Sequence, residues 1–194
     1  GDCIFASNAQ SIGSQIIVTQ NAELSLNEST ISLDDKQFGH GIETLAGATI
    51  LVEGIHFTNI STNELTIGEM KDGNAIIIHE DSRLATISNN EFSDCYRSEQ
   101  NSFIISCYGP MKLDSNIFTF SENKGCGCVL VSYTGTETID IQIRNNQFLN
   151  VDNSGRPNSN ANSALYVHQT HSNTIIENNT FDQCDNINSP ACFY

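Results

Sequence analysis

A short phrase that ends in phenylalanine recurs along this chain. Its clearest copies read TISNNEF, KLDSNIF, QIRNNQF and TIIENNTF, and a weaker one reads LVEGIHF. Their last residues, Phe57, Phe92, Phe118, Phe148 and Phe181, lie 35, 26, 30 and 33 residues apart. Self-similarity at a period of about 20 to 50 residues is typical of repeat architectures, in which each copy forms one structural unit. We therefore expect the chain to stack similar units on one another.

Alignment on the phenylalanine reveals two further columns. The residue five positions earlier is always branched and apolar: Val52, Ile87, Leu113, Ile143 and Ile176. The residue two positions earlier is an asparagine in four copies: Asn90, Asn116, Asn146 and Asn179. Alternation of apolar and polar residues is typical of a β-strand with one buried face. The phrase therefore predicts a strand, a bend that contains asparagine, and an inward phenylalanine.

A second β-rich segment follows each phrase after a link of variable length. These segments read AIIIH (75–79), SFIIS (102–106), CVLVS (128–132) and ALYVH (164–168). Links such as NVDNSGRPNSNANS are too short and too polar to form crossover helices. Parallel strands without helical crossovers can be brought together by winding the chain as a solenoid, with neighbouring coils about 4.8 Å apart. Asparagines at one bend then stack as a ladder of side-chain amides.

We therefore predict an all-β fold, a single right-handed parallel β-helix of about six or seven coils, with residues 1–194 as one domain. This pattern resembles the fold of pectate lyases and many surface adhesins, closely from residue 47 onward and loosely before it. A β-sandwich with coincidental repetition is the alternative. The residues expected to point inward are Ile50, Val52, Phe57, Ile87, Phe92, Leu113, Phe118, Ile143, Phe148, Ile176 and Phe181.

Composition narrows the partners and the compartment. The formal net charge is -15 with only eight Lys and Arg, so nucleic acid and anionic membranes are poor partners. No run of 18 apolar residues is present that would insert into a membrane. Seven cysteines and three possible glycosylation sites, at Asn27, Asn59 and Asn178, favour an extracellular or cell-surface location. Strand-like segments at both ends suggest a segment of a longer surface protein.

The sequence offers weak candidates for catalysis. Gly39-His40-Gly41 resembles a polygalacturonase motif, but the N-T-D and R-I-K motifs of that family are missing. Calcium-dependent pectate lyases need carboxylates on adjacent coils, and the outward column Glu53, Ser88, Asp114, Arg144, Glu177 does not stack two. His79 and His168 share a predicted column with two coils between them, too far apart to hold one metal ion. We therefore predict no catalytic residue, metal or cofactor, while a glycosidase carboxyl pair formed between loops stays open.

A further resemblance suggests a function. The runs NNEFSDC (89–95) and NNTFDQC (178–184), with FSEN (120–123), are similar to polymorphic membrane protein repeats, in which F-x-x-N or F-x-x-C is followed by a G-G-A-I word. Here the second word reads GNAI, NSAL or CGCV. The resemblance implies a non-catalytic module, displayed at a cell surface, that binds host cells or glycans. A polysaccharide lyase or glycoside hydrolase is the alternative.

The second strand also suggests where a partner would bind. If its flanking residues face inward, then Ile77, Ile104, Leu130 and Tyr166 face outward on successive coils. Monomeric surfaces seldom leave such an apolar stripe bare. We therefore expect a protein-binding or self-association face there, unless the loop of residues 151–163 covers it or an inverted register turns the column inward.

Overall fold

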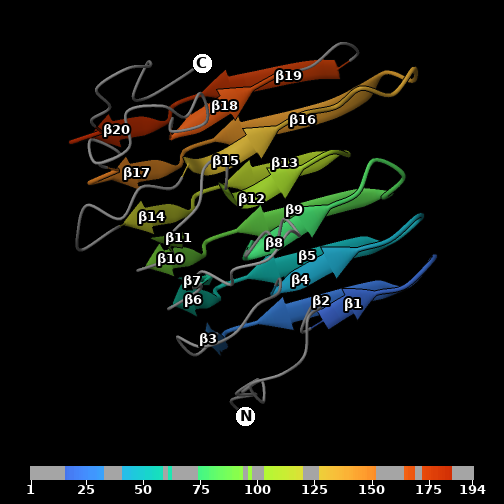
Figure 1. The fold of residues 1–194 in the computed structure, drawn as a ribbon, viewed down its shortest axis with the longest axis horizontal. Helices are drawn as coiled ribbons and strands as arrows, with labels where there is room; N and C mark the ends of the chain where they lie inside the picture. The colour runs from blue at the N-terminus through green and yellow to red at the C-terminus, as the bar shows by residue number, and fades with distance from the viewer. Residues whose placement is uncertain are drawn as a thin grey trace, which may run out of the picture.

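The computed structural model describes residues 16–32, 41–58, 61–62, 74–93, 96–97, 103–119, 127–151, 164–168 and 172–184. These residues form a parallel β-solenoid built from three six-stranded sheets, and none of them lies in a helix (Figure 1). All strand pairs are parallel, and each interior strand of the three large sheets pairs with its equivalent in the preceding and following turn. The predicted fold class, an all-β parallel solenoid, is confirmed.

Each turn of the solenoid contributes one strand to each sheet. The first sheet contains β1 (Ile16–Val18), β4 (Ile42–Thr44), β8 (Ile76–Ile78), β12 (Phe103–Cys107), β15 (Gly127–Val131) and β18 (Leu165–Val167). The second contains β2 (Glu23–Asn27), β5 (Thr49–Glu53), β9 (Leu84–Ser88), β13 (Met111–Asp114), β16 (Ile139–Arg144) and β19 (Ser172–Glu177). The third contains β3 (Thr30–Ser32), β6 (His56–Thr58), β10 (Glu91–Ser93), β14 (Ile117–Thr119), β17 (Gln147–Leu149) and β20 (Thr180–Asp182).

We call one strand from each of these three sheets a rung. The described strands form six rungs, of which the middle four have a neighbouring rung on both sides in all three sheets. About four turns are therefore stacked on both sides, fewer than the six or seven coils expected from the sequence. A short fourth pairing joins β7 (Ser61–Thr62) to β11 (Tyr96–Arg97).

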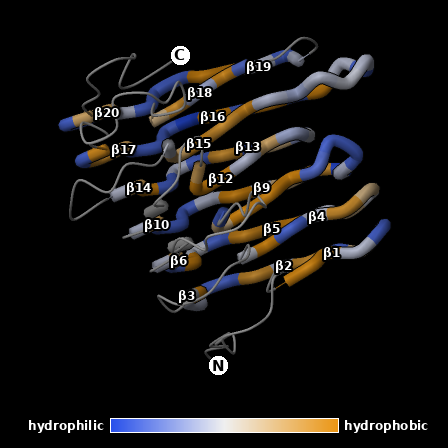
Figure 2. Tube along the Cα trace, viewed as in Figure 1, coloured by the Kyte–Doolittle hydropathy of each residue, from blue (hydrophilic) through white to orange (hydrophobic). Residues whose placement is uncertain are grey.

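The core lies between the three sheets and is built from stacked identical positions. Four phenylalanines of the recurring phrase, from Phe57 to Phe148, are fully buried. Their rings and that of Phe181 stack in order, with centroids 4.7 to 4.9 Å apart and interplanar angles of 5° to 8°. Figure 2 shows apolar stretches along the strands of the stacked rungs, with hydrophilic stretches between them. All predicted inward residues lie in the core or against it, with Ile176 and Phe181 of the sixth rung only half-buried.

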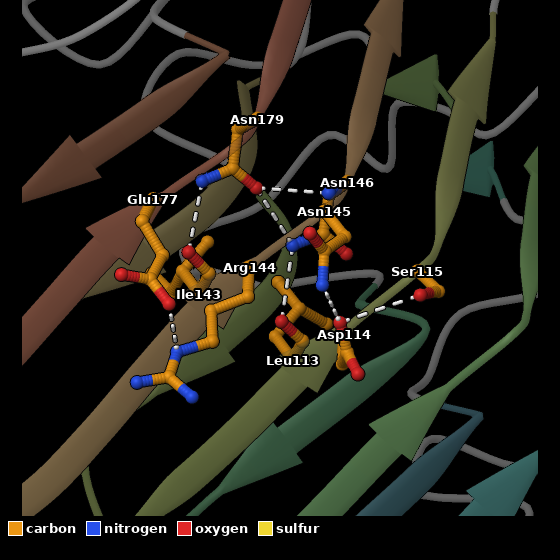
Figure 3. A network of polar contacts seen from close by, with 9 residues as sticks. All are labelled: Leu113, Asp114, Ser115, Ile143, Arg144, Asn145, Asn146, Glu177 and Asn179. Carbon is orange, nitrogen blue, oxygen red and sulfur yellow. Dashed lines mark hydrogen bonds and ion pairs between the residues drawn. The ribbon is translucent and has the colours of Figure 1, made fainter.

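The predicted asparagine ladder is present at the bend between the second and third sheets. The Oδ1 atom of Asn116 accepts hydrogen bonds from the backbone N–H and the Nδ2 of Asn90, at 3.0 and 2.9 Å. The same two bonds join Asn116 to Asn146. They also join Asn146 to Asn179, as Figure 3 shows. Each ladder Nδ2 also donates to a carbonyl of the preceding rung at 2.8 to 3.0 Å. These bonds satisfy amides that would otherwise be costly to bury.

A second column at the same bend was not anticipated. The residue immediately before each ladder position has a left-handed backbone, with φ between 47° and 65°: Glu28, Gly54, Asn89, Ser115, Asn145 and Asn178. Glycine and asparagine adopt this conformation more readily than other residues. The Asn-Asn pair of the phrase therefore has two separate roles, because its first member makes the turn and its second builds the ladder.

Candidate functional site

A groove lies over the turns that connect the first sheet to the second. It encloses about 600 Å³ and is lined by residues of three successive rungs. The third rung contributes Glu80 to Arg83, the fourth Pro110, and the fifth Tyr133, residues 135–137 and Ile139. Clefts of this size are within the range that holds small ligands or a few sugar units.

Unequal link lengths create this groove. The link between β12 and β13 has only three residues, 108–110, whereas the links of the rungs on either side have five, 79–83, and seven, 132–138. Because each rung lies directly on the next, a short link between two longer ones leaves a hollow over the fourth rung. Gly109 lies within this short link, where a Cβ would collide with the backbone oxygen of His79.

The wall from the third rung is fixed by buried hydrogen bonds. The hydroxyl oxygens of Thr44 and Ser82 are 2.6 Å apart, and both residues are buried. The backbone N–H of His79 donates to Thr44 Oγ1 at 3.1 Å, and the N–H of Ser82 donates to the oxygen of His79 at 3.0 Å. These bonds leave Glu80, Asp81 and Arg83 exposed on a turn whose backbone is held in place.

The opposite wall is held by an aromatic anchor. Tyr133 is only 4% exposed, although it lies in a link between strands. Gly135 packs against its ring so closely that a Cβ would collide with the phenol oxygen. A larger residue at this position would therefore require the Tyr133 ring to shift. The close packing places the exposed Thr136 and Glu137 at the rim.

The groove presents hydrogen-bonding groups of both kinds. Glu80, Asp81 and Glu137 supply carboxylate acceptors, and Arg83 supplies a guanidinium donor. No group of three or more His, Cys, Asp or Glu side chains in the described part of the chain could hold a metal ion. Such a lining can bind a polar ligand with many hydroxyl or amino groups, or it can place carboxyl groups beside a reacting bond.

The predicted apolar stripe is corrected by the register of the first sheet. Ile77 pairs with Ser106, Ser106 with Leu130, and Leu130 with Tyr166. Ile104 therefore lies two residues before the predicted position, and it is 3% exposed and part of the core. Ile77 is also buried, at 9% exposed, whereas Leu130 and Tyr166 are half-buried. The prediction of a continuous exposed stripe of these four residues is therefore wrong. Residues 152–163 of the suggested covering loop lie outside the described residues.

The predicted outward column of charged residues is confirmed. Arg144 lies between Asp114 and Glu177 in register, and its Nε is 2.9 Å from Glu177 Oε1. The Asp114 carboxylate instead accepts hydrogen bonds from Asn145 Nδ2, at 2.7 Å, and from the hydroxyl of Ser115 (Figure 3). Each charge in this column therefore has its own partner, which relieves the like-charge stacking.

The two histidines remain separated. Because of the shifted register, Tyr108 and Ser132 lie between His79 and His168, in place of the predicted Ser106 and Ser132. Nε2 of His79 is 2.9 Å from Oε1 of Glu43 on the neighbouring rung.

The remaining sequence candidates are surface positions or lie outside the described residues. Asn27 and Asn178 are exposed, as glycosylation sites must be, while Asn59 and His40 lie outside the described residues. Cys3, Cys95, Cys126 and Cys192 also lie outside them. Cys107 and Cys128 are buried and Cys184 is half-buried.

The groove residues Glu80, Asp81, Arg83, Tyr133 and Glu137 were missed by the sequence analysis. Columns that repeat in the sequence identify the core, whereas these residues lie in links that do not repeat. The signal that would have identified them was the length of the links, because the segment between SFIIS and KLDSNIF is the shortest of its kind.

Comparisons with protein-family models, with curated proteins and with solved structures found no match to this chain. No helix in the described part of the chain is long and apolar enough to cross a membrane.

Proposed function

We propose that this chain is a non-catalytic β-helix module of an extracellular or cell-surface protein that binds a glycan ligand in the groove over its fourth rung. The observation that carries this proposal is the groove itself, which is about 600 Å³ in volume and combines three carboxylates with one guanidinium. Sugars are recognised by such mixed hydrogen-bonding groups beside a ring or an apolar surface. The resemblance of the repeats to those of surface adhesins supports display and binding.

Charge selects among the possible glycans. The groove carries three carboxylates and one guanidinium, within a molecule of net charge -15. This field repels polyuronic acids and attracts cationic groups. The ligand class that fits is therefore a neutral or amino-sugar-containing glycan.

The test is a binding series with three soluble oligosaccharide classes: neutral, amino-sugar-containing and uronic. We expect neutral or amino-sugar oligosaccharides to bind, and affinity to fall at least about tenfold, or about 1.4 kcal/mol, in Glu137→Gln. Glu91→Gln is the matched control, because Glu91 is an exposed glutamate on β10 of the third sheet, outside the groove. Equal loss in both variants, or binding of the uronic class alone, would contradict the proposal.

A polysaccharide-degrading enzyme is the second candidate. The observation that favours it is that Glu80 and Glu137 line one groove from rungs on either side of the fourth, since glycoside hydrolysis needs two carboxyl groups that flank the scissile bond. Incubation with acidic and neutral polysaccharides, with and without calcium, would show new reducing ends or unsaturated products. Turnover that Glu80→Gln or Glu137→Gln abolishes, and Glu91→Gln does not, would replace binding by catalysis.

A further inference from the structure

The second sheet ends in two strands that have a partner on one side only among the described residues, β2 and β19. Their inward residues are less well covered than those of the interior strands. Leu24 and Leu26 of β2 are half-buried, whereas Ile50 and Val52 beside them are at most 1% exposed. Thr174 and Ile176 of β19 are likewise half-buried, beside a fully buried Ile141 and Ile143. Such strand edges are templates for pairing with another chain.

The two edges are complementary when the register of the sheet is continued. One inward column runs from Leu24 through Ile50 and Ile141 to Thr174, and the other runs from Leu26 to Ile176. A second copy whose β2 lies on β19 in this register would place its Leu24 on Thr174 and its Leu26 on Ile176. The apolar columns would then continue across the junction without a change of face.

The outward residues of the two edges also match. In the same register Glu23 of the second copy faces Asn173, Ser25 faces Ile175, and Asn27 faces Glu177. No carboxylate faces another carboxylate, so no like-charge stacking opposes the contact.

The sheet already contains this type of pair. Asn27 stands opposite Glu53 within the molecule, and Nδ2 of Asn173 donates to Oδ1 of Asp140 at 3.1 Å. An amide over a carboxylate is therefore a stacking that this sheet uses between its own rungs.

We propose that β2 of one molecule pairs in parallel with β19 of another, so that the second sheet continues head to tail from copy to copy. The two surfaces differ, so the contact does not close a dimer and generates an open series of oligomers. The net charge of -15 opposes the approach of two copies, so salt promotes association. This proposal concerns the ends of the solenoid and is independent of ligand binding in the groove.

The first test is sedimentation velocity over a range of protein concentrations, at low salt and at about 1 M sodium chloride, where the Debye length is about 3 Å. We expect the mass to rise with concentration through trimers and higher species, and more strongly at high salt. A protein that stays monomeric in both salts, or that stops at a dimer, overturns the proposal.

A pair of matched variants locates the interface. Ile175 and Leu51 occupy the same outward column of the second sheet. Ile175 lies on the end strand β19 and is 41% exposed, whereas Leu51 lies on the interior strand β5 and is 37% exposed. A lysine on an edge strand blocks pairing, whereas on an interior strand it adds only the same charge. We expect Ile175→Lys to weaken association at least tenfold and Leu51→Lys to leave it close to that of the original protein. Equal effects would place the interface elsewhere.

A third variant tests the opposite edge. The backbone oxygen of Ala22 accepts a hydrogen bond from the N–H of Thr49, and the N–H of Glu28 donates to the backbone oxygen of Glu53. The backbone N–H and C=O groups of the even-numbered residues of β2 therefore point toward β5. The N–H of Ser25 therefore faces the edge of β2 that has no partner among the described strands. Proline there removes a donor without breaking a hydrogen bond to β5. We expect Ser25→Pro to keep its circular dichroism melt and to lose association as Ile175→Lys does. Unchanged association in a folded Ser25→Pro protein would contradict pairing through β2.

Discussion

The left-handed residue before each ladder asparagine is the most restricted single position in the fold. Ser115 occupies it in the fourth rung with φ 58°, whereas Asn89, Asn145 and Asn178 occupy it in other rungs. Asparagine adopts this conformation at lower cost than serine. We expect Ser115→Asn to raise the free energy of unfolding by about 0.5 to 1 kcal/mol, measured by urea denaturation. Lys112→Asn, at an exposed strand position, is the control and should give no gain.

The buried thiol of Cys107 predicts a pH dependence. Burial raises the pKa of Cys107 from 9.0 to about 12, against a smaller opposing effect of a hydrogen bond with the backbone of Gly109. Above pH 9 the unfolded chain loses this proton while the folded protein keeps it, so the contribution to stability is full below pH 9 and falls between pH 9 and 12.

The measurement is the free energy of unfolding at several pH values between about 8 and about 11, a range that brackets the ordinary thiol pKa. Cys107→Val is a suitable control, because Val131 follows Cys107 in the same column, and it should lose part of the alkaline decline. An identical decline in both proteins would assign the effect to other groups. Native protein should also resist thiol reagents at Cys107, since the thiolate is the reactive form.

The strands derive their stability from stacking on both sides, so position along the solenoid decides the cost of a substitution. Phe118 is fully buried between the rings of Phe92 and Phe148. Phe181 is half-buried and stacks on Phe148 alone among the described rings. We expect Phe118→Ala to lower the free energy of unfolding by about 3 to 5 kcal/mol, and Phe181→Ala by clearly less, in guanidinium denaturation. Equal losses would show that the sixth rung is as well covered as the fourth.

The sequence predicted the second and third sheets better than the first. In each copy of the phrase, the branched apolar residue and the ladder position lie at fixed distances before the phenylalanine. This spacing defines the register of both sheets without reference to the links. In the first sheet the segment SFIIS was placed two residues out of register, because links of variable length precede it. A shift of two residues keeps every side chain on the same face, so the hydrophobic pattern does not reveal it.

The whole molecule carries more negative charge than its size requires for solubility, and the excess acts on stability. Self-repulsion at a net charge of -15 favours the expanded chain. We expect the melting temperature to rise when salt increases from about 10 mM to about 150 mM, as the Debye length falls from about 30 to about 8 Å. The measurement is a thermal melt at dilute protein, and near the pI of about 4.4 the salt effect should vanish. A salt effect of the same size at both pH values would contradict this explanation.

The groove could not be predicted in the same way as the core. Core residues must repeat because each rung presents the same inward positions to its neighbours, and repetition is visible in the sequence. The groove arises from a difference between rungs: the three-residue link that contains Pro110 lies beside the seven-residue link that contains Tyr133. A difference in link length predicts a groove only when it is known which links lie side by side in the structure.

The even spacing of the phenylalanine rings has a consequence for how such a molecule can change in evolution. The ladder bonds of each asparagine reach no further than the neighbouring rungs, and each rung advances the ring stack by 4.7 to 4.9 Å. Duplication or loss of one repeat would therefore lengthen or shorten the molecule by that single step and leave the bonding of all other repeats intact. The length of the solenoid would then be adjustable in units of one coil, independently of any change to the residues that line the groove.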